Sequence, residues 1–350
     1  MIIRMHVRAR HAASTLALAG LAVLAMPVDA KTIEYTYQVL KSPTRLRLDA
    51  AALSPLGEVV GRVSPKGDRT RSSTFALTSD GFASWTILGS ENSIGAGVNA
   101  SGDIVGIAYQ SIANQAFLLP ANGTAFALFA PEQVENSTAR GINASGSVVG
   151  GYELVGSSVS VPYVWRNGTT TSLPTLGGSM NSAIAINDAG TIVGIVAAAD
   201  DQTGFGARWD DGVMQVLPTP AGTRDATPVA ISSNGIIGGE ILTGTYLIRP
   251  CLWQNGQFVA LPASNSTPAS VSGVNAAGVA VGSATISPQS KAGAVIWRNG
   301  TITKLDKLVD IPDDWYIAEG LAINDAGQIL VMGYDPKGNS NSMLLTPIAH

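Results

Sequence analysis

A short phrase recurs seven times along the chain, and this repetition limits the possible folds more than any other feature of the sequence. Each copy contains an apolar residue, an Asn or Ser, two variable positions, a glycine and a short apolar run. The copies occupy 52–61, 97–106, 141–150, 185–194, 230–239, 273–282 and 322–331. The glycines after the two variable positions, at 57, 102, 146, 190, 235, 278 and 327, lie 43 to 49 residues apart, so the chain contains seven copies of one unit.

A second phrase follows the first within the unit. Four tryptophans lie 44 residues apart, and each precedes an x-Asn-Gly or x-Asp-Gly step. They are Trp165, Trp209, Trp253 and Trp297. Asn-Gly and Asp-Gly favour two-residue hairpin turns because both positions tolerate positive φ. We expect the tryptophans to pack between neighbouring units rather than to form a ring that stacks on a ligand.

Each unit is typical of four short strands. In the fourth copy, 182–187 and 191–196 are β-branched, alternating segments on either side of the turn at Gly190. Four strands in about 44 residues match one blade of a β-propeller. The sequence therefore predicts an all-β fold, a seven-bladed β-propeller.

The two ends of the chain complement each other. The seventh copy has two strands and then 342–348, so its fourth strand is missing, whereas the segment 33–40 has no partner before the first copy. We expect this N-terminal strand to close the ring as the outermost strand of blade seven, because an open ring would leave a sheet edge exposed. Six blades plus a cap is the alternative.

The repeat resembles the bacterial HAF repeat, found in exported proteins of unassigned function. The resemblance rests on AINDAGTIVG (185–194), QAFLLP (115–120) and LPTLGG (173–178), and it extends over essentially all of the chain after residue 30. The histidine of the family is absent from every copy, where Gln115 or Pro162 stands instead. No role of that histidine is therefore carried over to this chain.

The N-terminus has the pattern of an export signal. Three arginines within the first ten residues precede an apolar stretch at 12–26, and small residues at Val28 and Ala30 suit signal peptidase. We expect a signal peptide at 1–30 and a single propeller domain at 31–350, located in the periplasm or outside the cell. An uncleaved anchor is the alternative.

Composition excludes several partners. Removal of 1–30 leaves 18 basic and 24 acidic residues without a basic patch, so no nucleic-acid partner is expected. No later segment is apolar enough to span a membrane. The single cysteine, Cys251, cannot form an intrachain disulfide and is interpreted as an inert core residue. We expect a monomer.

Histidine is missing from the repeats. His6 and His11 lie in the predicted signal peptide, and His350 is terminal. Histidine-dependent triads and metal sites are therefore not expected, and we predict no cofactor and no metal. The repeated asparagines are interpreted as turn residues that accept a backbone N–H.

Binding residues are expected on the variable loops. The segment 309–320 stretches the last spacing and combines aromatic residues with acids, which is typical of a contact to a sugar or a cation. Three further candidates are expected at or near the start of inner strands, at the mouth of the central channel. The candidate ligand-binding residues are Trp315, Tyr316, Asp313, Asp314, Glu319, Arg224 and Arg140.

The sequence favours a non-catalytic exported propeller, a binding or scaffold module for an envelope or extracellular glycan or protein. The first alternative is a glycoside hydrolase or lyase that uses carboxylates at the channel mouth, with Glu319, Asp225 and Asp314 as candidates. The second is a structural component of a surface or matrix.

Overall fold

The computed structural model describes residues 33–349 except 45, 69, 112, 131 and 287–289. The signal peptide predicted for 1–30 lies outside the described residues. Within the compact unit Ile33–His350, the described residues form 28 strands and one short 3-10 turn, η1 (Leu305–Lys307). The all-β prediction is confirmed. No helix among these residues has the length and hydropathy needed to cross a bilayer.

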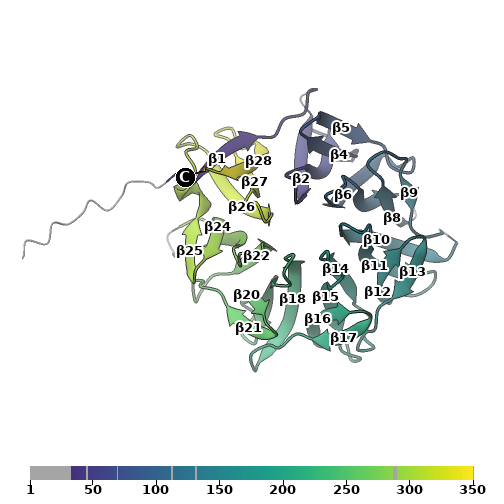
Figure 1. Cartoon of the computed structure of the whole chain (residues 1–350). Helices are drawn as coiled ribbons and strands as arrows, with labels where there is room; N and C mark the ends of the chain where they lie inside the picture. Colours follow the sequence, from purple (N-terminus) through teal and green to yellow (C-terminus); the bar gives the residue numbers. More distant parts are fainter. Residues whose placement is uncertain are drawn as a thin grey trace, which may run out of the picture. The chain divides into compact units, whose positions relative to one another are not determined.

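The strands form sheets arranged around a common axis (Figure 1). Five sheets have four strands, in the orders β2-β3-β4-β5, β6-β7-β8-β9, β10-β11-β12-β13, β22-β23-β24-β25 and β1-β28-β27-β26. The sixth has eight strands, in the order β14-β15-β16-β18-β19-β20-β21 with β17 on β16.

The strands of the first three units are β2 (Arg47–Leu53), β3 (Val59–Ser64), β4 (Ser73–Thr78), β5 (Gly81–Trp85), β6 (Asn92–Val98), β7 (Ile104–Tyr109), β8 (Asn114–Leu119), β9 (Phe126–Ala127), β10 (Val134–Ile142), β11 (Val148–Leu154), β12 (Ser160–Arg166) and β13 (Thr169–Ser172). Those of the next two are β14 (Ser182–Ile186), β15 (Ile192–Ala197), β16 (Gly204–Asp210), β17 (Val213–Val216), β18 (Thr223–Ile231), β19 (Ile237–Thr243), β20 (Ile248–Gln254) and β21 (Gln257–Ala260). The last units contain β22 (Ala269–Val274), β23 (Ala280–Ala284), β24 (Gly293–Arg298), β25 (Thr301–Lys304), β26 (Tyr316–Ile323), β27 (Ile329–Tyr334), β28 (Ser340–Pro347) and the N-terminal β1 (Tyr35–Val39).

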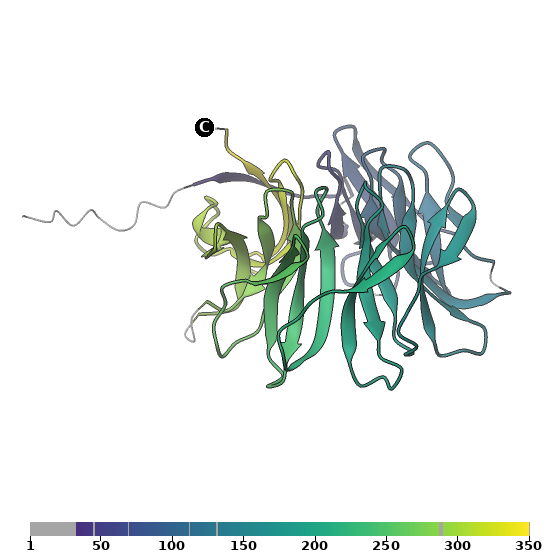
Figure 2. The same cartoon turned by 60° about the horizontal axis from the view of Figure 1, so that its bottom comes forward.

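One strand of each unit lies nearest the axis, and we call these the inner strands: β2, β6, β10, β14, β18, β22 and β26 (Figure 1). Each inner strand contacts the next, and β26 contacts β2. Turns gather at both ends of the strands (Figure 2). We call the face formed by the turns that follow the inner strands the asparagine face.

The first and last parts of the chain meet. Strand β1 pairs antiparallel with β28, with Tyr35 opposite Pro347. The hydroxyl of Ser342 accepts the Ala50 N–H at 3.1 Å and donates to the Leu48 carbonyl at 3.3 Å, so β28 is also bonded to β2. Leu330 packs in one apolar cluster with Leu48 and its neighbours.

The predicted turn chemistry is confirmed. The glycine three residues after the Asn or Ser of each copy has positive φ, as at Gly190 (φ 85°), a conformation that side chains with a Cβ rarely adopt. In the hairpins after the tryptophans, Asn167, Asp211, Asn255 and Asn299 all have φ near 50°, and each precedes a glycine that also has positive φ.

The core lies between neighbouring sheets. Trp209, Trp253 and Trp297 are buried, and the indole N–H of each donates to the carbonyl of a proline 35 residues earlier, in the preceding unit. Trp165 is half-buried and lies against Phe126 of the preceding unit. The prediction that the tryptophans pack between units is therefore confirmed.

The repeated asparagines hold their own turn, as predicted. The Asn187 Oδ1 accepts the Thr191 N–H at 3.0 Å, and the equivalent bond recurs at Asn99, Asn143, Asn275 and Asn324. Ser54 and Ser232 replace asparagine in two units, and their hydroxyls accept the same N–H.

The asparagines also bond to the next unit, which the sequence did not indicate. The Nδ2 of Asn99 donates to the Asn143 carbonyl, Asn143 to Asn187 and Asn187 to Ser232, at 3.1 to 3.2 Å. Asn275 donates to Asn324, and Asn324 donates to Ser54 across 270 residues of sequence. We call this series of bonds the asparagine ladder.

Serine separates the two roles of Asn187, because its hydroxyl can hold the turn but cannot reach the next unit. We expect Asn187→Ser to lower the free energy of unfolding by about 1 kcal/mol, since the buried Ser232 carbonyl loses the bond to the preceding unit and keeps only the Gly235 N–H of its own turn. Asn187→Ala should lower it further because the turn bond is also lost. Urea denaturation measures both, with Asn265→Ala in an exposed loop as the control. Wild-type stability of Asn187→Ser would show that the ladder contributes nothing.

Candidate functional site

Seven apolar side chains surround the axis at the asparagine face. Each is the last residue of an inner strand, directly before the ladder position, and together they line a cavity of about 260 Å³. We call them the collar: Leu53, Val98, Ile142, Ile186, Ile231, Val274 and Ile323. The repeat thus places one apolar side chain from every unit at the same height around the axis.

The rim of this cavity is polar, but its carboxylates already have partners. Asp188 accepts the Ala144 N–H at 2.8 Å, and Asp325 accepts the Ala276 N–H at 2.7 Å and the Ser233 hydroxyl at 2.6 Å. Both acids therefore bond to turns of other units. Among the described residues, no group of three or more His, Cys, Asp or Glu side chains could hold a metal ion.

Every inner strand carries a β-bulge at the same place, two residues before the collar. At each bulge one residue has no opposite partner in the neighbouring strand. These residues are Ala51, Ala96, Arg140, Ile184, Val229, Ser272 and Leu321. Arg140 is the charged member of this set, and it is exposed. Bulges re-aim side chains at functional sites.

The expected position of Arg140 is wrong. Arg140 lies near the end of β10, because that strand begins at Val134, several residues earlier than the repeat phrase suggests. Arg224 is the second residue of β18, as expected. Its guanidinium lies 4.3 Å from the centre of the Tyr246 ring, and its Nη1 donates to the Tyr246 hydroxyl at 2.6 Å.

The aromatic residues of 309–320 are partly buried by their neighbours. The Trp315 side chain packs against the apolar core around Ile317, and the Trp315 backbone N–H donates to the Pro312 carbonyl at 2.9 Å. Tyr316 is half-buried and stacks on Tyr334, with ring centres 6.5 Å apart. Burial raises the pKa of Tyr316, as do the charge of Asp306 and the nearby Tyr334. Asp313 and Asp314 are exposed.

Two of the candidate acids, Asp225 and Glu319, lie on different inner strands. Asp225 lies in β18 and its Oδ1 accepts the Gly204 N–H at 2.7 Å, which joins the two halves of the eight-stranded sheet. Glu319 lies in β26, and β22 separates β18 from β26 in the succession of inner strands. Glu319 is half-buried, and burial raises its pKa.

Two features of the surface escaped the sequence analysis. The collar could have been found from the apolar residue that precedes every Asn or Ser in the repeat. A second group of charged side chains lies on β2, β3 and the loop after β3, where basic residues are frequent between 41 and 71. Cys251 is buried, and burial together with the charge of Glu240 raises the pKa of its thiol, as expected for an inert residue.

Comparison with known proteins supports the fold. No family model and no curated protein matches the chain. The propeller domain of the Trilobed protease from Pyrococcus furiosus is similar, with a TM-score of 0.61 and 10% identity over 86% of this chain and 92% of that one. An acylaminoacyl peptidase in complex with Z-Gly-Gly-Phe-chloromethyl ketone is similar with a TM-score of 0.56 and 10% sequence identity over 87% of this chain. The match spans about half of that peptidase, 51%.

The uncomplexed acylaminoacyl peptidase from Pyrococcus horikoshii is similar with a TM-score of 0.55 and 10% sequence identity over 86% of this chain and 51% of that one. The chain is therefore a β-propeller by its fold. At such low identity the likeness concerns the fold alone.

These findings correct the functional prediction. The module for a glycan or an envelope protein was inferred from Trp315, Tyr316 and neighbouring acids, yet Trp315 packs against the core and the similar propellers are parts of peptidases. The correction extends to the glycosidase and matrix alternatives. Long-range packing of the 309–320 segment, which its composition does not encode, is the physical reason for the error.

Glu319 provides a test of the electrostatics. Because burial raises its pKa, the folded chain binds the proton more tightly than the unfolded chain does. Stability should therefore fall as the pH rises through the pKa of the unfolded state, about 4.3, and then through the raised pKa of the folded state. We expect Glu319→Gln to lack this loss in urea titrations, whereas Glu132→Gln, at an exposed position, should behave as wild type. Parallel pH profiles for wild type and Glu319→Gln would contradict this.

Proposed function

We propose that this propeller serves peptide hydrolysis by receiving an extended polypeptide segment at the collar and presenting it to a peptidase. The observation that carries the proposal is the ring of seven apolar side chains around a cavity of about 260 Å³. A cavity of that size takes a few side chains of an unfolded segment and excludes a folded domain. Apolar residues with a few fixed polar groups around them are the usual lining of a binding cavity.

The surrounding chemistry supports a peptide as occupant. Backbone groups of the turns and the exposed polar side chains of Asp188, Ser233 and Asp325 surround the collar, and a peptide offers one N–H and one carbonyl per residue to such groups. Arg140 supplies a positive charge on an inner strand, and no described carboxylate lies within ion-pair distance of it. The similar propellers named above belong to peptidases, which supports the same class of substrate.

Obstruction of the cavity tests this function. Ala144 is exposed and lines the cavity, so Ala144→Arg should fill its entrance without disturbing the core. We expect wild type to bind a short, unstructured, fluorescein-labelled apolar peptide, and Ala144→Arg to bind it about tenfold more weakly by anisotropy. Ala199→Arg, on the exposed loop between β15 and β16, is the matched control. A wild-type protein without peptide binding, or equal affinity of Ala144→Arg, would refute the proposal.

We further propose that the propeller has seven blades, with β1 as the outermost strand of the last. The eight-stranded sheet then counts as two blades, because its halves β14–β17 and β18–β21 are connected by the single pairing of Gly204 with Asp225. The ladder bond from Asn324 to Ser54 and the pairing of β1 with β28 support closure between the last and first units.

Membership of the HAF-repeat family and export also remain proposals, supported by the repeat phrases and by the N-terminal pattern. Mass spectrometry of the protein recovered from cells tests export. We expect the chain to begin at Lys31, because Val28 and Ala30 suit cleavage after Ala30. A recovered chain that retains residues 1–30 would favour the uncleaved anchor.

A further inference from the structure

A salt-bridged pair in the first unit has no counterpart in the other six. Asp49 of β2 lies opposite Arg62 of β3. The equivalent opposed pairs are Ile94 with Ile107, Thr138 with Gly151, Ser182 with Ile195, Thr227 with Glu240, Ser270 with Ser283 and Glu319 with Met332. Six units therefore form without an arginine at this position, so the fold does not require one.

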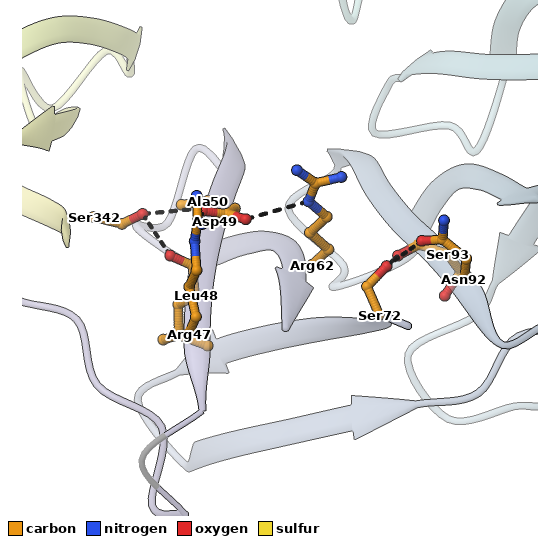
Figure 3. Close-up of polar contacts among 9 residues, drawn as sticks. All are labelled: Arg47, Leu48, Asp49, Ala50, Arg62, Ser72, Asn92, Ser93 and Ser342. Carbon is orange, nitrogen blue, oxygen red and sulfur yellow. Dashed lines mark hydrogen bonds and ion pairs between the residues drawn. The ribbon is translucent and has the colours of Figure 1, made fainter. Parts of the chain in front are cut away.

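Asp49 holds two arginines together on one face of the sheet. Its Oδ1 accepts from the Arg47 Nε at 2.9 Å and its Oδ2 accepts from the Arg62 Nε at 3.3 Å (Figure 3). Both guanidinium groups are bound through Nε alone among the described residues, so their Nη groups remain available as donors. An arginine that is already positioned loses less conformational entropy when a ligand binds.

A third arginine is held in the same way from the loop after β3. The Nε of Arg71 donates to the Asp68 Oδ2 at 2.9 Å. The hydroxyl and the N–H of Thr70 donate to the Asp68 Oδ1 at 2.7 and 2.8 Å. These hydrogen bonds, first those of Thr70 and then that of Arg71, hold the pKa of Asp68 far below its usual range. Asp68 thus stays ionised and keeps Arg71 in place.

The three arginines converge on one cavity. Arg47, Arg62 and Arg71 line a cavity of about 180 Å³ with the two carboxylates and with Ser64 and Ser72, and we call this the arginine pocket. It shares Arg47 and Asp68 with a cavity of about 680 Å³. Five basic side chains line the two cavities against three carboxylates: Lys41, Arg47, Arg62, Lys66 and Arg71 against Asp49, Asp68 and Asp335. This local excess of positive charge contrasts with the net charge of −4 of the whole chain.

We propose that the arginine pocket binds a phosphate-type oxyanion, with an organic substituent of the ligand in the larger cavity. Guanidinium groups bind phosphate through paired, charge-assisted hydrogen bonds. Three guanidinium groups suit the three terminal oxygens of a phosphate monoester better than the two oxygens of a carboxylate. The larger cavity offers Leu40, Leu46 and Tyr334 to an organic group.

Calorimetry on the folded chain at low salt tests this assignment, with inorganic phosphate, phenyl phosphate and benzoate as probes. We expect saturable binding of phenyl phosphate, weaker binding of inorganic phosphate and the weakest binding of benzoate. Arg62→Gln and Arg71→Gln should each weaken phenyl phosphate binding about tenfold. Both residues are exposed, so the variants should fold. Arg166→Gln, an exposed arginine of β12, is the charge-matched control and should bind as wild type.

The outcomes separate the parts of the proposal. Equal affinity for inorganic phosphate and phenyl phosphate would support the oxyanion site and overturn the organic substituent. Absence of saturable binding, benzoate as the tightest probe, or unchanged affinity of both arginine variants would overturn the site. Ala144→Arg should keep phenyl phosphate binding, so this result is independent of the peptide at the collar.

Discussion

The amide of the repeated asparagine connects local turn geometry to the arrangement of the whole molecule. Its oxygen holds the turn of its own unit, and its nitrogen binds the carbonyl at the same position of the next unit. Both partners are backbone groups, so at these positions hydrogen-bond length limits how closely neighbouring inner strands approach. Five of the seven junctions between the described units carry such a bond, whereas Ser54 and Ser232 hold only their own turns.

The close approach of neighbouring strands explains why the repeat has small residues at two further positions. The residue before each collar position is glycine or alanine, and at Gly273 a Cβ would lie 3.0 Å from the Ile323 nitrogen of the next inner strand. The glycine that ends most copies has a comparable reason, since a Cβ at Gly194 would lie 2.0 Å from the Ser182 carbonyl oxygen. The conserved spacing within the repeat is therefore a record of contacts at the axis.

The fold could be predicted because the repeat displays these constraints seven times. The turn glycines, the hairpin steps after the tryptophans and the unpartnered segment 33–40 each correspond to an observed feature. The site could not be predicted in the same way. Trp315 and Tyr316 were chosen by composition. Trp315 is partly buried because it packs against the apolar cluster that contains Ile317 of β26, and Tyr316 stacks on Tyr334 of β27. Asp225 was chosen as an acid, whereas its partner Gly204 belongs to another unit.

The repeat also allows equivalent positions of the seven units to be compared, so that residues specific to one unit can be recognised. Where seven positions share one backbone environment, a residue that differs from the other six is not explained by folding alone, and Arg62 is such a residue. This comparison within one chain needs no related sequence. The comparison separates residues that the fold needs in every unit from residues, such as Arg62, that occur in one unit and are not needed for folding.

The pairing of β1 with β28 has a consequence for how the chain acquires its structure. Most repeat proteins add units one after another, and each addition is nearly independent of distant parts. Here β1 pairs with β28, a strand about 300 residues later in the chain, so this sheet depends on contacts of very high sequence separation. A chain interrupted before residue 340 leaves β1 without β28 and exposes an unpaired strand to other chains. The last sheet is therefore complete only after β28 has joined β1.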